Sequence, residues 1–348
     1  MKWSWRLILI GLLFCGLVFS SVSIAEEGKW TRKADMPIAV ASHSLSAVNG
    51  KIYVIGGIYG LWNLNIKTFS TLYEYDPKAD IWSRKADMST PRTSHRTCVI
   101  DGKIYAVGGW TDGDFTNAIE AYDPITDRWE KKADMPTKRG ESAVDQVNGR
   151  IYVMGGHNKH SGVCLSIVEE YNPKTNTWTK KNDMPTARSF ATNCAVNGKI
   201  YLIGGANDNN FPNAKFLTTV EIYDPSTDTW TKGSDIPTPR ITSASFAVNG
   251  MIYVMGGTSK SFSILSTVEI YDTKNDTWTK GESMPVARDS MASYPMVDGK
   301  FYAIGGYGSS LNTLSDAWEY DTGFRDNLTS VDAKGKLTTT WGEIRRTK

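Results

Sequence analysis

The sequence predicts an all-β fold in which six copies of a four-stranded antiparallel sheet close into a ring. Two observations lead to this prediction. A glycine pair that ends an apolar strand occurs six times, in steps of 47 to 52 residues, and the two ends of the repeated region each lack strands that the other end supplies. With 31 Gly, 12 Trp and 16 Tyr, the composition is that of a β-rich globular protein rather than a disordered one.

Each repeat opens with two strands, a and b, joined by a tight turn. An Asn-Gly or Asp-Gly dipeptide precedes every glycine pair, and these dipeptides favour the two-residue turn whose twist matches a β-hairpin. They stand at 49–50, 101–102, 148–149, 197–198, 249–250 and 298–299. The glycine pairs follow at 56–57, 108–109, 155–156, 204–205, 256–257 and 305–306. Because glycine is costly in an ordered strand, we expect each pair to admit a ring or a neighbouring backbone at close range.

Strands c and d complete each repeat, as in the stretch TVEIYDPSTDTWTKGSD from residue 219. Tyr223 ends strand c, residues 224–228 have turn chemistry, and Trp230 lies in strand d. Matching tryptophans stand at 30, 82, 129, 178, 230 and 278. Such a sheet cannot bury both of its faces alone, so the repeats must stack in a row or in a ring.

The ends of the repeated region favour the ring. Trp30 belongs to a strand d with no strands a, b or c before it, and the last repeat ends at Asp321 without a strand d. Donation of the first strand to the last sheet closes a ring, whereas an open row has no use for it. The sixth sheet is therefore predicted to consist of residues 289–321 and the strand at Trp30.

The apolar-Gly-Gly motif, the Tyr of strand c and the Trp of strand d together resemble the Kelch-repeat β-propellers. The resemblance covers residues 30–322 and implies a six-bladed propeller. It implies little about function, because the motif residues are expected to hold the blades together.

The first 25 residues are predicted to be a secretory signal peptide. Lys2 and Arg6 precede an apolar run at 7–19 that is short for a membrane span, and Ser23-Ile24-Ala25 offers small residues for cleavage after Ala25. An uncleaved anchor and a lipoprotein attached through Cys15 are the alternatives. We therefore expect an exported protein, periplasmic or extracellular, with a propeller at 26–322 and a tail of unknown role at 323–348.

The expected mature chain is electrically balanced, with 37 basic and 37 acidic residues once Lys2 and Arg6 are removed from the 39 and 37 of the whole chain. This balance argues against nucleic-acid binding, and no second apolar segment suggests a membrane contact. The mature chain would keep Cys98, Cys164 and Cys194, an odd number that predicts no disulfide framework. We expect a monomer without a cofactor or metal, although His157, His160 and Cys164 have metal-ligand types.

The b–c and d–a connections should share one face of the disk, and the b–c segments vary most between repeats. Aromatic rings beside short carboxylates and amides suit a sugar ring and suit a polypeptide equally well. The predicted function is therefore a non-enzymatic binding module for a protein or a glycan. The predicted ligand-binding residues are Tyr59, Trp62, Trp110, Asp112, Asp114, His157, Asn207, Asp208 and Tyr307.

The alternative is a carbohydrate-active enzyme resembling N-acetylneuraminate epimerase, which would need an acid and a base near the channel. Glu141, Asp145, Arg139 and Arg288 are the candidates for that chemistry. The two arginines belong to a repeated row with Arg92, Arg188 and Arg240, for which a structural role in binding loop carbonyls is predicted. An ion pair between Arg96 and Asp145 of adjacent blades is a further expectation.

Overall fold

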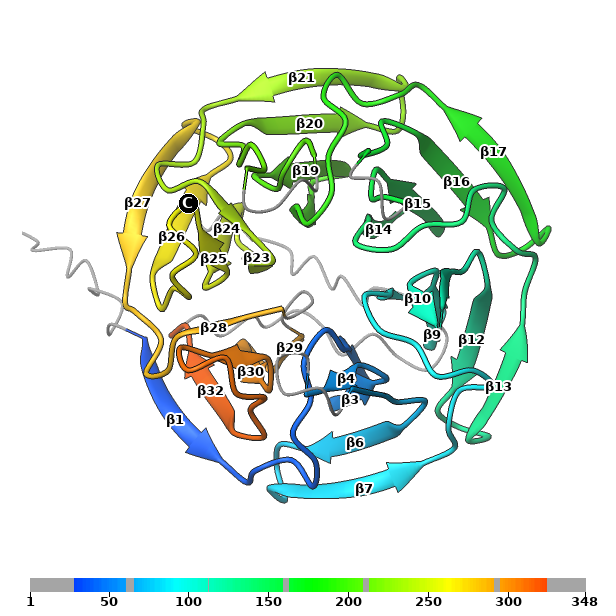
Figure 1. Ribbon diagram of the computed structural model, residues 1–348, viewed down its shortest axis with the longest axis vertical. Coiled ribbons are helices and arrows are strands. Elements are labelled where there is room, and N and C mark those ends of the chain that lie inside the picture. Colours follow the sequence, from blue (N-terminus) through cyan, green and yellow to red (C-terminus); the bar gives the residue numbers. More distant parts are fainter. Residues whose placement is uncertain are drawn as a thin grey trace, which may run out of the picture.

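A computed structural model describes residues 28–60, 66–111, 113–158, 163–208, 213–290 and 295–323. These residues form a disk of six four-stranded antiparallel sheets, the blades, around a central axis (Figure 1). The predicted signal peptide lies outside the described residues, as does the predicted tail beyond Gly323. The described part of the chain includes no helix that is long and apolar enough to cross a membrane.

The four strands of a blade run outward from the axis in the order a, b, c, d. The innermost strands a are β2 (Ser44–Val48), β8 (Arg96–Ile100), β14 (Ala143–Val147), β18 (Thr192–Val196), β23 (Ala244–Val248) and β29 (Met296–Val297). Strands b are β3 (Lys51–Ile55), β9 (Lys103–Val107), β15 (Arg150–Met154), β19 (Lys199–Ile203), β24 (Met251–Met255) and β30 (Lys300–Ile304). Blades are numbered 1 to 6 in the order of these strands.

Strands c and d form the outer half of each blade. Strands c are β6 (Leu72–Asp76), β12 (Ile119–Asp123), β16 (Val168–Asn172), β20 (Val220–Asp224), β26 (Val268–Asp272) and β32 (Ala317–Asp321). Strands d are β7 (Ile81–Lys85), β13 (Arg128–Lys131), β17 (Thr177–Lys181), β21 (Thr229–Gly233), β27 (Thr277–Gly281) and, in blade 6, β1 (Lys29–Lys33). The N-terminal strand thus closes the last blade as predicted, with Trp30 paired to Tyr320.

The repeated turns and glycines have the conformations that the sequence requires. In the first a–b turn both Asn49 and Gly50 have positive φ, at 50° and 73°, as the two-residue hairpin turn demands. Gly56 also has positive φ, and a Cβ there would lie 2.6 Å from the carbonyl oxygen of Arg92 in the next blade. The glycine pairs therefore admit neighbouring backbone, and Gly57 donates a hydrogen bond to that same carbonyl over 2.8 Å.

The Trp and Tyr of the motif fasten each blade to the one before it. In blade 1, Trp82 Nε1 donates to the carbonyl of Ala34 over 2.9 Å. Asp80 accepts from the Ala34 amide over 2.9 Å and from the Tyr75 hydroxyl. The same bond from the Trp recurs in blades 2 to 5, at Trp129, Trp178, Trp230 and Trp278.

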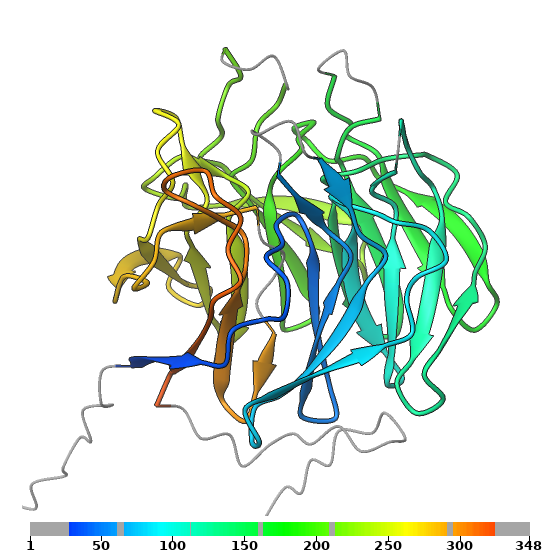
Figure 2. The same cartoon turned by 60° about the horizontal axis from the view of Figure 1, so that its bottom comes forward.

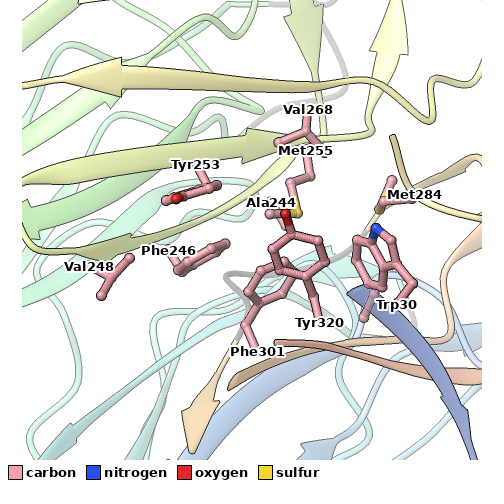
Figure 3. Packing of buried hydrophobic residues seen from close by; sticks show 11 residues of the cluster. Trp30, Ala244, Phe246, Val248, Tyr253, Met255, Val268, Met284, Phe301 and Tyr320 are labelled. Atoms are coloured by element: carbon pink, nitrogen blue, oxygen red, sulfur yellow. The ribbon is translucent and has the colours of Figure 1, made fainter. Parts of the chain in front are cut away.

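The joint between blades 5 and 6 uses apolar packing in place of this polar fastening (Figure 3). Among the described residues Trp30 Nε1 has no hydrogen-bond partner, and Gly28 stands where Asp80 stands in blade 1. Instead, Trp30 packs against Phe301 and Tyr320, with ring centroids 5.3 and 5.0 Å apart. Phe246 of strand a in blade 5 packs against Phe301 with ring centroids 4.0 Å apart, so an aromatic cluster fills the seam between blades 5 and 6.

Candidate functional site

One face of the disk carries the b–c and d–a connections, and we call it the loop face (Figure 2). Several of these connections contain short extra strands. Two pairs form hairpins within a b–c loop: β4 (Ile58–Tyr59) with β5 (Lys67–Thr68), and β10 (Trp110–Thr111) with β11 (Asp114–Phe115). Two pairs join the d–a connection to the b–c loop of the same blade: β22 (Arg240–Ile241) with β25 (Thr258–Ser259), and β28 (Arg288–Asp289) with β31 (Tyr307–Gly308). The opposite face holds the tight a–b and c–d turns, so variation in sequence concentrates on the loop face.

A belt of six equivalent residues surrounds the axis just before the strands a begin. Its members stand two positions after the repeated arginine or Val40, and all have φ between 50° and 58°: Ser42, Ser94, Glu141, Phe190, Thr242 and Ser290. Five of the six amides donate to the carbonyl of the belt residue in the preceding blade, over 2.7 to 3.1 Å. The belt surrounds the axis on the loop face, and only Glu141 is charged in it.

The row of arginines lies inside the blades and is not available at the surface. Each guanidinium is buried, bonds a glycine-pair carbonyl, and pairs with a carboxylate on strand c or, in blade 6, just before it. The pairs are Arg92–Glu120, Arg139–Glu169, Arg188–Glu221, Arg240–Glu269 and Arg288–Asp316. Blade 1 has Val40 and Tyr73 at these two positions, so the two charges are absent together. A buried charge without its partner is costly, which accounts for this joint replacement.

The predicted Arg96–Asp145 ion pair is wrong. Arg96 pairs instead with Glu141 of the belt, at 3.3 Å with both side chains mostly buried. Asp145 lies further along strand β14 and accepts a hydrogen bond of 3.0 Å from Asn193 in the next blade. Burial raises the pKa of Asp145 to about 6, although hydrogen bonds from the Gln146 amide and Asn193 oppose the rise.

Three further titratable groups, one aspartate and two histidines, lie close to the belt and are buried in the packing of the blades. Asp289 accepts a hydrogen bond from Thr258 in blade 5, and burial raises its pKa to about 6, with Glu141 adding to the rise. His43 and His95 are buried under the belt, and burial lowers the pKa of both, to about 4 for His43. We therefore assign no proton transfer to the histidines.

The predicted aromatic ligand residues differ in their exposure. Tyr59 is 42% exposed at the tip of blade 1, whereas Tyr307 is buried beneath the blade 6 hairpin. His157 is buried between the rings of Phe115 and Phe190, at 4.8 and 5.4 Å. Trp110 is half-buried, and Trp62 lies outside the described residues.

The predicted polar ligand residues also differ in their exposure. Asp114 is exposed and pairs with Lys138 at 2.8 Å. Asn207 and Asp208 are half-buried in the blade 4 loop, where Asp208 bridges to Val163 of blade 3. Asp112 lies outside the described residues. The structure therefore does not bring the predicted set together as one site.

The structure exposes several apolar side chains on the loops, and of these only Tyr59 was predicted from the sequence. Of seven large hydrophobic side chains that are exposed in the described structure, five lie on b–c loops: Tyr59, Ile66, Val163, Phe262 and Leu311. Phe262 and Leu311 occupy equivalent positions in blades 5 and 6, with φ of 58° and 57°. A large apolar residue in the left-handed region is unfavourable. The ring of Phe262 lies edge-on to that of Phe216 in the blade 4 loop, with ring centroids 5.9 Å apart. The signal in the sequence was a lone apolar residue among Ser, Gly and Asn in each of these turns.

Comparison with known proteins identifies the family. The profile of the Attractin/LZTR1 β-propeller matches residues 64–318, which is more than half of the chain. The chain belongs to the Attractin/LZTR1 β-propeller family.

Relatives of this propeller include Kelch proteins. It is 34% identical over 88 residues to Kelch repeat and BTB domain-containing protein 12 of Homo sapiens, covering 24% of this chain and 14% of that protein. It is 36% identical over 83 residues to Kelch-like ECH-associated protein 1B of Danio rerio, covering 24% and 14%. The match thus spans about one seventh of the length of these relatives. A solved structure entitled "Structure of YjhT" superposes with a TM-score of 0.70 over 82% of this chain and 95% of that one, at 17% identity, which shows the shared fold.

Within the described residues no group of three or more His, Cys, Asp or Glu side chains is placed to hold a metal ion. His160, one of the metal-type residues noted in the sequence, lies outside the described residues. The loop face carries exposed apolar side chains, among them Phe262 and Leu311.

Proposed function

We propose that this chain is an exported, non-enzymatic binding module that holds a protein ligand on its loop face. The observation that carries the proposal is the pair of exposed apolar tips, Phe262 and Leu311, each in a backbone conformation that disfavours it. Residues kept in unfavourable conformations cluster at functional sites. Neither tip is needed to form its turn, because Asn or Gly would adopt the same φ at lower cost.

The exposed tips favour a protein over a glycan. Sugar rings stack on aromatic faces, but three of the five exposed residues, Ile66, Val163 and Leu311, are aliphatic. Of the predicted aromatic residues, His157 and Tyr307 are buried by packing from neighbouring blades. Packing against another polypeptide would remove these aliphatic and aromatic tips from water, as in the apolar core of a protein interface.

The enzyme alternative receives less support from the same face. Arg139 and Arg288 are buried in blade ion pairs, and Glu141 is neutralised by Arg96. Asp145 remains as the one candidate with a raised pKa, and an amide, Asn193, faces it. An acid–base reaction needs two groups that reach one substrate, so a binding function fits this arrangement better.

The proposal is tested by affinity capture with the chain from residue 26. Wild-type protein should retain a protein from the exported fraction of its source cells. A Phe262→Asn, Leu311→Asn double variant should lose that protein. Ile125, which is 78% exposed on the opposite face, supplies the control, because Ile125→Asn removes a still more exposed apolar group there. Equal capture by all three proteins would contradict the proposal. Binding only to sugars on a glycan array would show that the ligand is a glycan rather than a protein.

Export is tested separately. Mass spectrometry of the protein recovered outside the cytoplasm should show a chain that begins at Glu26. A full-length chain in that fraction would favour the uncleaved anchor.

A further inference from the structure

Buried histidines lie in the joints on both sides of blade 1. His43 follows the belt residue of blade 1, and His95 follows that of blade 2. Both side chains are wholly buried, at 0% exposed. The equivalent residues in blades 3 to 6 are Ser142, Ala191, Ser243 and Met291. Histidine at this position is therefore confined to the two joints that flank blade 1.

Each imidazole reaches into the glycine pair of the preceding blade. The ring of His43 extends to Gly305 in blade 6, where an added Cβ would lie 3.0 Å from its Cε1 atom. The ring of His95 extends to Gly56 in blade 1, where the corresponding distance would be 2.8 Å. Blade 1 lies between blades 6 and 2 in the ring (Figure 1). The two rings are therefore part of the packing between blades, and neither joint stays closed without them in place.

The surroundings of the two rings favour the neutral imidazole. None of the four ring nitrogens has a hydrogen-bond partner within the described residues. The charged groups that act on the rings are cations, namely Arg288 and Arg96 on His43, and Arg92 and Arg96 on His95. The carboxylates of this region are already engaged, three of them by these arginines and one by Thr258: Asp316, Glu141, Glu120 and Asp289.

The two histidines therefore give up protons when the joints close. Burial lowers the pKa of His43 to about 4 and that of His95 well below its ordinary value, and the arginines add to both effects. The nearby Ile304 carbonyl opposes the lowering in His43. An opened joint returns each ring to water, where its pKa is about 6.5. The stability of the closed joints is thus complete above pH 6.5 and is lost as the pH falls toward 4.

Blade 1 also lacks an internal bond that the other blades have. In blades 2 to 6 a buried arginine bonds a carbonyl of the glycine pair, whereas blade 1 has Val40 at that position. Blade 1 therefore combines two joints that contain histidine with the absence of this bond. In mild acid it should open before the other blades.

We propose that blade 1 is an acid-sensitive element of the ring, which separates from blades 6 and 2 when His43 and His95 are protonated. The β4–β5 hairpin belongs to blade 1, so the loop face would change shape on that side. This inference goes beyond the proposed function and does not depend on it, because it concerns the ring itself and not the ligand.

Amide hydrogen exchange, followed by mass spectrometry at pH 7.5 and at pH 5.0, tests the inference on the chain from residue 26. With a pKa of 6.5 in the open joint and about 4 in the closed joint, one histidine should raise the opening equilibrium about thirtyfold between these two pH values. After correction for intrinsic exchange rates, peptides from β2 and β3 of wild-type blade 1 should show a rise of this size or larger.

Two sets of variants separate titration from packing. His43→Ser and His95→Ser introduce the residue of blades 3 and 5, and each should lessen the rise, while the double variant abolishes it. A cavity left by serine increases opening equally at both pH values, so it leaves the ratio unchanged. His43→Gln and His95→Gln keep more of the volume without a titratable group and should give the same result if the serine variants do not fold.

Blade 3 supplies the internal control. Its Asp145 acts with the opposite sign, because its pKa is raised, so peptides from β14 and β15 should open no more readily at pH 5.0 than at pH 7.5. If blades 1 and 3 open together in acid, or if wild type and variants show the same ratio between the two pH values, the inference is overturned.

Discussion

The buried Arg188–Glu221 pair of blade 4 can be compared with its natural replacement in blade 1. The two side chains are 2.9 Å apart and almost wholly buried. Arg188 also donates to the carbonyls of Gly204 and Thr219, over 3.0 and 3.2 Å. Burial lowers the pKa of Arg188, and the Glu221 charge opposes this. We therefore expect each charge to depend on the other.

The expected free energies follow from this geometry. Arg188→Val or Glu221→Tyr alone leaves a buried charge and should cost about 3–5 kcal/mol of unfolding free energy. The double variant reproduces the Val40 and Tyr73 combination of blade 1 and leaves no charge. It should lose mainly the two bonds to the carbonyls, about 1 kcal/mol each. The coupling energy between the two positions should thus be about 3 kcal/mol or more.

Denaturant unfolding of the wild type, the two single variants and the double variant gives this coupling. At roughly 2 °C per kcal/mol for a domain of this size, each single variant should also melt about 6–10 °C lower. The exposed pair Lys232–Asp235, at 3.1 Å, serves as a control and should couple by less than about 1 kcal/mol. A blade 4 double variant as unstable as the sum of its singles would refute the reasoning.

Three further predictions concern the ring, the thiols and the channel. Deletion of residues 26–37 removes β1 and bares the edge of β32, so size-exclusion chromatography should show association and calorimetry a lower melting temperature; a monomer with unchanged melting would sink the closure argument. Thiol titration of the denatured, unreduced chain from residue 26 should count three thiols, since none of Cys98, Cys164 and Cys194 is in a disulfide, and a count of one would mean that two of them are bonded. Because the pKa of Asp145 is raised from 3.8 to about 6, its ionisation destabilises the folded state, and its contribution to stability should fall as pH rises from about 4 to about 6. Asp145→Asn should abolish that fall and gain at most about 3 kcal/mol at pH 7; parallel pH profiles for variant and wild type would show that Asp145 is not the group responsible.

The repeats determined the fold because their signals are local. An Asn-Gly turn, an apolar strand and a terminal glycine pair act within about ten residues, and none of them depends on contacts with distant parts of the chain. The unpaired strand at Trp30 even specified the closure, since only blade 6 lacked a strand d. The purpose of the glycines was predicted correctly as close approach of backbone, which the Arg92 carbonyl makes at Gly56.

The site depended on the tertiary structure because exposure of a loop side chain is decided by other loops. Tyr59 and Tyr307 both follow a glycine pair closely, yet one is exposed and the other is buried under packing from three blades. Glu141, and not Asp145, meets Arg96, because the belt brings the start of each strand a against the preceding blade. The sequence therefore determined where a variable face must lie. Only the packing of blade on blade decided which side chains remain on that face to meet a partner.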